Sequence, residues 1–236
     1  MGLIETTDRD GVRIVALRDE AGQNALDRPM VEALTDALAV PESVRAVVLR
    51  GAPEVFSRGA SPRVLAQLEE GEIAPTELTL PRAVLGVEVP VVAAMEGHAI
   101  GGGLALGLCA DVVVLAEESR YGATFVDLGF TPGMGMTRLL ERVMSPLMAH
   151  ELLLGGEPRR GRDLRHVGFN HVVPRREVWP RALEIADRFA EKRRSVLTML
   201  KAELARPWRR AFEEAREAEA EMHARCFEAL RRASDA

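Results

Sequence analysis

The chain is poor in cysteine, tyrosine and lysine, and it contains no long uninterrupted apolar run. Cys109 and Cys226 are too few for a disulfide scaffold, and neither stands at metal-ligand spacing from a histidine. No segment reaches the roughly 18 consecutive apolar residues of a membrane span, and the start of the chain lacks the basic and apolar regions of a secretory signal. We therefore expect free thiols, no metal, no membrane partner and a cytoplasmic protein.

The net charge and the length of the chain further limit the kinds of protein that it can be. A net charge of −5 disfavours a nucleic-acid partner, although arginines cluster over residues 159–165. This cluster is either a solvated face or a patch for an acidic carrier protein or for the phosphates of a thioester cofactor. With 236 residues, 47% of them hydrophobic, the chain can form one globular core with a helical appendage. We expect the core over residues 1–176 and the helical region over residues 177–236.

The most informative run is EGHAIGGGLALGLCAD, residues 96–111. It follows a short apolar run behind Pro90 that is typical of a buried strand, and it continues into an apolar helix. Gly101, Gly102 and Gly103 carry no Cβ, so the backbone there can approach another molecule closely. The first amides of a helix lack partners and suit an oxyanion, a phosphate or a carboxylate. A tight turn packed against a neighbouring element would have the same pattern.

Other periodic segments outline the remaining elements. Residues 4–7 and 12–17 predict a hairpin, and residues 46–49, 91–95 and 112–116 predict strands that alternate with helices. From Val178 onward the pattern is helical. We expect one helix to end near Leu204 and another, long helix to begin at Pro207.

Three motifs in order resemble the enoyl-CoA hydratase/isomerase (crotonase) superfamily. They are VFSRGA at residues 55–60, GHAIGGG at 97–103 followed by CAD at 109–111, and GFTPGMG at 129–135. The resemblance covers roughly residues 3 to 205. It implies an α/β fold of the crotonase (ClpP-like) type, a spiral of β-β-α units with a C-terminal helical region through which family members form trimers. It also implies an acyl thioester substrate on CoA or phosphopantetheine, and no other cofactor.

By matching position, the resemblance assigns the two backbone amides that hold the thioester carbonyl oxygen to Ala60 and Gly102. Reactions of this family build negative charge on that oxygen, and one preorganised donor can lower a barrier by roughly 3 kcal/mol. Gly101, Gly133 and Phe125 are expected to contact the substrate.

Two glutamates that hydratases of this family use are missing. One follows the triple glycine by two residues and the other lies on the next loop, and these positions hold Ala105 and Phe125 here. Neither residue can transfer a proton, so ordinary hydration is disfavoured. Tyr121, the only tyrosine, can either offer its hydroxyl to the pocket or pack in the core.

Within the superfamily, the motifs are most similar to the decarboxylating branch of polyketide β-branching cassettes. That branch acts on a 3-methylglutaconyl-type thioester tethered to an acyl carrier protein, and loses CO2 through a dienolate that the oxyanion hole stabilises. It usually adds a histidine from the C-terminal helix, matched here by His223, whose unperturbed pKa near 6.5 suits proton delivery.

The branch also usually adds a lysine from the loop after residue 60, and this lysine has no counterpart. Lys192 and Lys201 both lie far downstream. The loop over residues 61–88 offers Arg63 and Arg82 instead, which can bind a carboxylate in bidentate fashion but are poor proton donors. The sequence thus predicts a lyase that decarboxylates an unsaturated acyl thioester, with an enoyl thioester isomerase and a catalytically silent binding subunit as alternatives.

Overall fold

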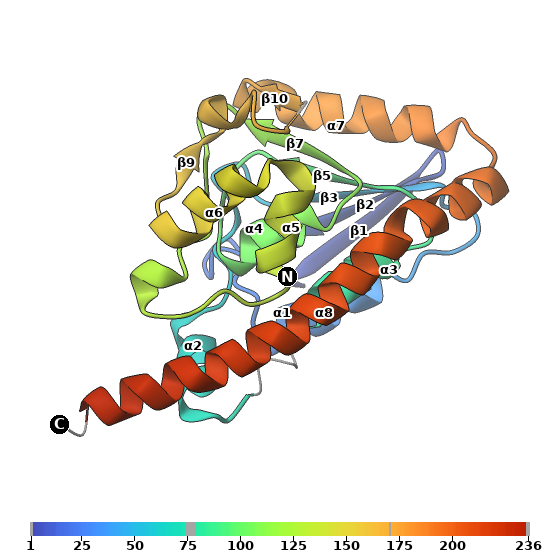
Figure 1. Cartoon of the computed structure of the whole chain (residues 1–236). Helices are drawn as coiled ribbons and strands as arrows, with labels where there is room; N and C mark the ends of the chain where they lie inside the picture. Colours follow the sequence, from blue (N-terminus) through green and yellow to red (C-terminus); the bar gives the residue numbers. More distant parts are fainter. Residues whose placement is uncertain (1, 74–78, 170, 235–236) are drawn as a thin grey trace.

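The computed structural model describes residues 2–73, 79–169 and 171–234, and Figure 1 shows two sheets surrounded by helices. Within these ranges the larger sheet has six strands, in the order β1-β2-β3-β5-β7-β10. β1 is antiparallel to β2, and the other neighbours are parallel. The strands of this sheet are β1 (Ile4–Arg9), β2 (Val12–Leu17), β3 (Ala46–Arg50), β5 (Val91–Met95), β7 (Val112–Ala116) and β10 (His171–Val173).

A smaller sheet stands beside it, in the order β4-β6-β8-β9. Its strands are β4 (Val55–Ser57), β6 (His98–Ile100), β8 (Arg120–Gly122) and β9 (Arg159–Arg160). Three successive units of the chain place one strand in the large sheet and the next in the small sheet, namely β3 with β4, β5 with β6 and β7 with β8. This repetition is the predicted β-β-α spiral of the crotonase fold.

Helices cover both faces of the large sheet because its parallel strands are apolar on both sides. On one face α7 packs Val178, Ala182 and Ile185 against the sheet. The opposite face carries the larger core, to which the helix of the glycine-rich run contributes. The helices are α1 (Arg28–Ala37), α2 (Pro62–Glu70), α3 (Leu80–Gly86), α4 (Gly102–Leu108), α5 (Met136–Val143), α6 (Pro146–Gly155), α7 (Arg175–Ala190) and α8 (Arg194–Ser234), with 3-10 turns η2 (Val126–Leu128) and η3 (Gly161–Leu164).

The last helix differs from the sequence expectation. We predicted a break between Leu204 and Pro207, but α8 is continuous over 41 residues and contains Pro207 in its interior. An interior proline removes one backbone donor and costs about 3 kcal/mol. Packing on both sides of the proline offsets this cost, since Ala205 and Phe212 are both buried in the core. α8 therefore crosses the molecule as one rod (Figure 1).

Other expectations about the chain are met in part. Within the described residues, the segment over residues 61–88 contains α2, which begins after Ser61 and ends before Gly71 as the sequence predicts, and also α3. Cys109 and Cys226 are free thiols. No helix in the described ranges is long and apolar enough to cross a membrane. The division at residue 176 stays a prediction.

Candidate active site

The loop after β4 is fixed by a buried asparagine. Nδ2 of Asn24 donates to the carbonyls of Val55 at 3.2 Å and Phe56 at 3.1 Å, and Oγ of Ser57 donates to the carbonyl of Asn24 at 2.7 Å. Asn24 is fully buried, so these bonds are shielded from water. They hold the loop that ends in Ala60, whose amide has no hydrogen-bond acceptor among the described residues.

The second loop joins β6 to α4. Gly101 has φ 53° and ψ −119°, a conformation that residues with a Cβ rarely adopt. Its amide donates to the carbonyl of Gly122 at 2.8 Å, which ties this turn to the small sheet. Gly102 is the first residue of α4, so its amide has no acceptor within the helix.

Gly59 brings the two loops into contact. A Cβ on Gly59 would lie 2.7 Å from the carbonyl oxygen of Ile100 and 2.9 Å from the nitrogen of Gly102, so the two backbones meet there without a side chain between them. Ala60 and Gly102 consequently border the same cavity, which has a volume of about 550 Å³. Two unpartnered amides on one cavity are what an oxyanion hole requires.

The walls of this cavity are mainly apolar. α2 packs against the C-terminal part of α8, where Val64 and Leu68 contact Phe227. The rings of Phe130 and Phe227 meet edge to face at 5.6 Å. Larger apolar residues in the lining are Leu26, Val64, Leu65, Leu68, Phe125, Leu128, Phe130, Met134 and Phe227. A charge that enters this interior loses hydration, which raises its free energy.

His223 is the histidine that α8 places at the cavity. Nδ1 of His223 lies 3.0 Å from the main-chain carbonyl of Glu219 and 3.2 Å from Oγ1 of Thr131. A carbonyl only accepts, so Nδ1 carries the hydrogen and Nε2 is left for other partners. Burial lowers the pKa of His223, and the hydrogen bond to the Glu219 carbonyl partly opposes that shift.

The side chain of Glu219 anchors the same turn of α8 to the core. Its carboxylate accepts from the amide of Gly135 at 2.7 Å, the amide of Thr137 at 2.9 Å and Oγ1 of Thr137 at 2.7 Å. These groups lie at the N-terminus of α5, where a negative charge is favoured. Glu219 is buried, and burial raises the pKa of its carboxyl group, although its three donors lower it.

Some of the other predicted site residues line the cavity and others do not. Gly101, Gly133 and Phe125 line the cavity. Arg63 is exposed on α2 and lies outside the lining, although its neighbours Pro62 and Val64 belong to it.

Arg82 and Tyr121 lie outside the lining of this cavity, and their role as substrate-binding residues stays a prediction. Arg82 pairs with Glu213 at 2.6 Å beside a separate surface groove of about 920 Å³. The Tyr121 hydroxyl donates to the carbonyl of Met95 at 2.6 Å and accepts from the amide of Ala116 at 2.8 Å. Burial raises the pKa of Tyr121, which acts as a structural core residue.

Neither lysine reaches the cavity. Lys201 is buried and pairs with Asp111 at 2.5 Å, and Lys192 pairs with Glu191 at 3.6 Å. Arg58 lines the cavity instead. Our sequence analysis did not single out Arg58, nor did it identify Asn24 and Glu219. Arg58 stands inside a motif that the analysis quoted, whereas the contacts of the other two residues depend on distant parts of the chain.

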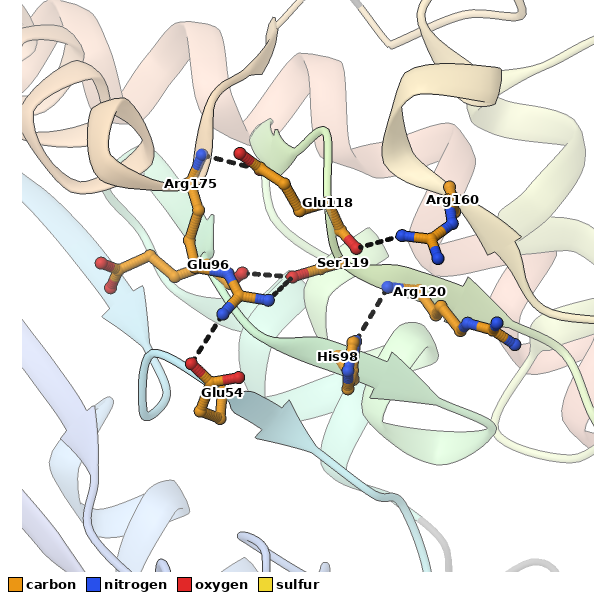
Figure 2. A network of polar contacts seen from close by, with 8 residues as sticks. All are labelled: Glu54, Glu96, His98, Glu118, Ser119, Arg120, Arg160 and Arg175. Atoms are coloured by element: carbon orange, nitrogen blue, oxygen red, sulfur yellow. Dashed lines mark hydrogen bonds and ion pairs between the residues drawn. The ribbon is translucent and has the colours of Figure 1, made fainter.

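A polar network supports the small sheet on its outer side, as Figure 2 shows. Arg175 donates to Glu54 at 2.6 Å and to Oγ of Ser119 at 3.3 Å, and Ser119 in turn donates to the carbonyl of Glu96 at 2.5 Å. His98, which precedes the glycine-rich turn, accepts from the amide of Arg120 at 2.9 Å. These bonds join the strands that carry both loops.

Arginines of the predicted basic cluster are largely engaged within the protein. Arg159 pairs with Glu151 at 2.5 Å, and Arg165 pairs with Glu117. Arg160 donates to the main-chain carbonyl of Glu118 at 3.4 Å (Figure 2). These contacts favour the solvated face over the partner patch for this segment.

A β-β-α spiral with two unpartnered amides at one apolar cavity defines the class. The chain belongs to the enoyl-CoA hydratase/isomerase (crotonase) superfamily, and the family model "Enoyl-CoA hydratase/isomerase" matches residues 7–234. Of the two positions at which the resemblance places the glutamates of hydratases, Phe125 lines the cavity and Ala105 is buried in α4.

Particular relatives place the chain within the superfamily. The bacillaene synthase decarboxylase PksI of Bacillus subtilis is 38% identical over 218 residues, which are 90% of this chain and 87% of PksI. The ECH2 decarboxylase domain of CurF from Lyngbya majuscula is 33% identical with a TM-score of 0.90, over 96% of this chain and 95% of that domain.

A further solved structure comes from a dehydratase/decarboxylase enzyme couple involved in polyketide β-branching. It is 36% identical with a TM-score of 0.92, over 95% of this chain and 94% of that chain. The present chain is accordingly a crotonase-fold decarboxylase of polyketide β-branching, which confirms the prediction of a lyase over those of an isomerase or a silent subunit.

Proposed function

We propose that the chain decarboxylates a 3-methylglutaconyl-type thioester carried on the phosphopantetheine arm of an acyl carrier protein. The amides of Ala60 and Gly102 hold the thioester carbonyl oxygen, and His223 supplies the proton. The observation that carries this proposal is the pair of unpartnered amides facing the same apolar cavity as His223.

The reaction needs an acceptor for electrons and a source for one proton. When the bond to the carboxylate carbon breaks, its electron pair enters the dienolate and CO2 leaves. The negative charge that develops on the thioester oxygen is stabilised by the two amides. The imidazolium form of His223 then protonates a carbon of the dienolate, and the neutral ring regains a proton from solvent.

The apolar walls of the cavity favour loss of CO2 from the bound substrate. Leu68, Phe130 and Phe227 offer a carboxylate no hydrogen bond, so the bound substrate is unfavourably solvated at the group that it loses. Neutral CO2 has no such penalty. The missing lysine is consistent with this arrangement, because the decarboxylation step itself requires an electron sink rather than a cation at the leaving carboxylate.

Intact mass spectrometry of a loaded carrier protein tests the proposal. Incubation with the chain should remove the mass of CO2 from 3-methylglutaconyl carrier protein, and Gly102→Pro, which lacks one amide, should not. An unchanged mass with the native chain, in an assay where a known decarboxylase is active, would refute the proposed substrate. A change in double-bond position without loss of mass would indicate an isomerase.

We also propose a homotrimer. Large apolar side chains are exposed in two separate places, around α6 with Leu147 and Leu154 and near the start of α8 with Met199 and Leu204. α6 and the start of α8 lie on different sides of the view in Figure 1. Two unlike surfaces that bind each other head to tail form a ring when the rotation between subunits closes, and a rotation of one third of a turn closes after three subunits. Light scattering after size exclusion should give three times the mass of one chain, and Leu147→Glu should reduce it.

A further inference from the structure

Arg58 differs from most arginines of this chain because it borders the catalytic cavity without a carboxylate partner. Exposed arginines elsewhere pair with acids, as Arg82 does with Glu213 at 2.6 Å and Arg210 with Glu214 at 2.9 Å. No acidic side chain in the described ranges forms an ion pair with Arg58, and none lines the cavity. A cation in this position is available to an external anion.

The backbone of Arg58 is held in place. Its amide donates to the carbonyl of Gln23 at 3.1 Å, and the carbonyl of Gly59 accepts from the amide of Leu26 at 2.9 Å. Arg58 stands two residues before Ala60, so their Cα atoms are at most about 7.6 Å apart. The side chain of Arg58 is exposed, and Arg58 and Ala60 both line the cavity.

A second cation stands close by. Arg63 is exposed on the first turn of α2, and the residues on either side of it, Pro62 and Val64, both line the cavity. It forms no ion pair among the described residues. The entrance thus carries positive charge, in contrast to the apolar interior and to the net charge of −5 of the whole chain.

The proposed substrate brings two anions to this site, its own carboxylate and the phosphodiester of the carrier arm. An ion pair with the carboxylate would stabilise the charge that the reaction removes, and binding that is stronger in the ground state slows catalysis. The phosphodiester keeps its charge throughout and remains outside the apolar interior. A guanidinium is well suited to two hydrogen bonds with phosphate oxygens.

We propose that Arg58 binds the phosphodiester of the phosphopantetheine arm as the arm enters the cavity. This inference rests on the proposed function for its substrate. It assigns to Arg58 recognition of the carrier rather than of the acyl group. Arg63 adds to the attraction of the arm at the same entrance.

Two soluble substrates separate the two anions. One is the 3-methylglutaconyl thioester of phosphopantetheine, and the other is the same thioester of pantetheine, which lacks the phosphate. Arg58→Ala should raise KM for the first by about tenfold, the effect of one lost charge-assisted contact, and leave kcat/KM for the second unchanged. Arg58→Lys should restore part of the loss. Arg188→Ala, which removes an exposed arginine from α7 on the opposite face of the sheet, is the matched control.

Two other kinetic results overturn the inference. An equal loss with both substrates would mean that Arg58 binds the acyl carboxylate, and no loss with either would mean that it binds neither anion. If the native chain turns over neither carrier-free thioester, the loaded carrier protein tests the proposed function, and calorimetry with phosphopantetheine and pantetheine tests Arg58 alone. Tighter binding of phosphopantetheine to the native chain than to Arg58→Ala, with no such difference for pantetheine, would still support the phosphate contact. Equal binding would refute it.

Discussion

Glu219 and His223 are joined by a hydrogen bond along one turn of α8, with Nδ1 of His223 3.0 Å from the Glu219 carbonyl. The carboxylate of the same Glu219 accepts three hydrogen bonds at the start of α5. One residue therefore fixes the ring through its main chain and the helix through its side chain. His223 is held over the cavity by this turn, and not only by packing.

Replacement of Glu219 should loosen this anchor. In Glu219→Gln one acceptor oxygen becomes an NH2 group that faces N–H donors, so we expect a loss of about 2 kcal/mol in unfolding free energy and a lower kcat. Urea unfolding and steady-state kinetics measure the two effects. Glu217→Gln, an exposed glutamate on the same helix, should change neither. Unaltered kcat in a folded Glu219→Gln protein would contradict the positioning role.

The pH dependence of stability follows from the lowered pKa of His223. In the unfolded chain this ring begins to bind a proton near pH 6.5, whereas in the folded chain it does so only at a lower pH. The unfolded state then binds more protons, so the contribution of this ring to stability is present above about pH 6.5 and is lost as pH falls toward the folded pKa. Urea unfolding at several pH values should show a shallower acid-side decline for His223→Gln than for the native chain. Parallel curves would contradict the shift.

The catalytic activity should depend on protonation of the His223 ring in the opposite way, and should fall as pH rises. Only the imidazolium can donate, so kcat/KM should decline as pH rises through the His223 pKa, with a midpoint below about 6.5. The residual activity of His223→Gln should lack this limb. A pH profile on a pantetheine thioester measures the effect without interference from a titrating phosphate or carrier protein. If kcat/KM of His223→Gln declined with pH in the same way as that of the native chain, a group other than His223 would be responsible for the decline.

Gly59 and Gly71 provide a matched pair, with φ of 80° and 78° respectively. A Cβ on Gly59 would meet backbone atoms of the second oxyanion loop, whereas one on Gly71 would meet nothing within 4 Å. Gly71→Ala should cost about 1 kcal/mol of stability from backbone strain alone and retain activity. Gly59→Ala should cost more and lower kcat/KM by about 100-fold, because it separates the two amides. Equal activities would show that the loops need not touch.

Replacement of Asn24 should lower both stability and kcat, although Asn24 is not one of the proposed catalytic residues. Asn24→Ala leaves the carbonyls of Val55 and Phe56 without their donor, which costs about 1–3 kcal/mol and frees the loop that ends in Ala60. We expect reduced kcat as well as a lower Tm. Gln23→Ala, the exposed neighbour, should leave Tm near that of the native chain. Normal kcat in Asn24→Ala would show that the loop is held by other contacts.

The parts of the site that sequence could predict are those encoded by local backbone. Gly101 and Gly102 stand at a strand-to-helix turn, and such a turn can be recognised from neighbouring residues alone. Glu219 contacts Gly135 across 84 residues of sequence, and no local pattern signals that contact. Arg82 pairs with Glu213 across 131 residues, and no local pattern signals that contact either.

The continuity of α8 was missed for a related reason. Pro207 is a reliable local signal for a helix end, but burial of Ala205 and Phe212 outweighed it. Tertiary packing is not visible in a window of neighbouring residues. The strands over residues 46–49, 91–95 and 112–116, by contrast, have a local apolar pattern and were predicted from it, whereas the spiral was predicted from the family resemblance.

The chain divides its chemistry between two structural parts that are made at different times. The proposed electron sink, the amides of Ala60 and Gly102, belongs to the early spiral, and the proposed proton source, His223, lies in the C-terminal part of α8. Synthesis of the first 200 residues supplies both amides before the histidine of α8 is made. Because α8 also adds Phe227 to the cavity wall and Glu219 to the N-terminus of α5, exchange of the last helix would alter the wall and the anchor together with the histidine.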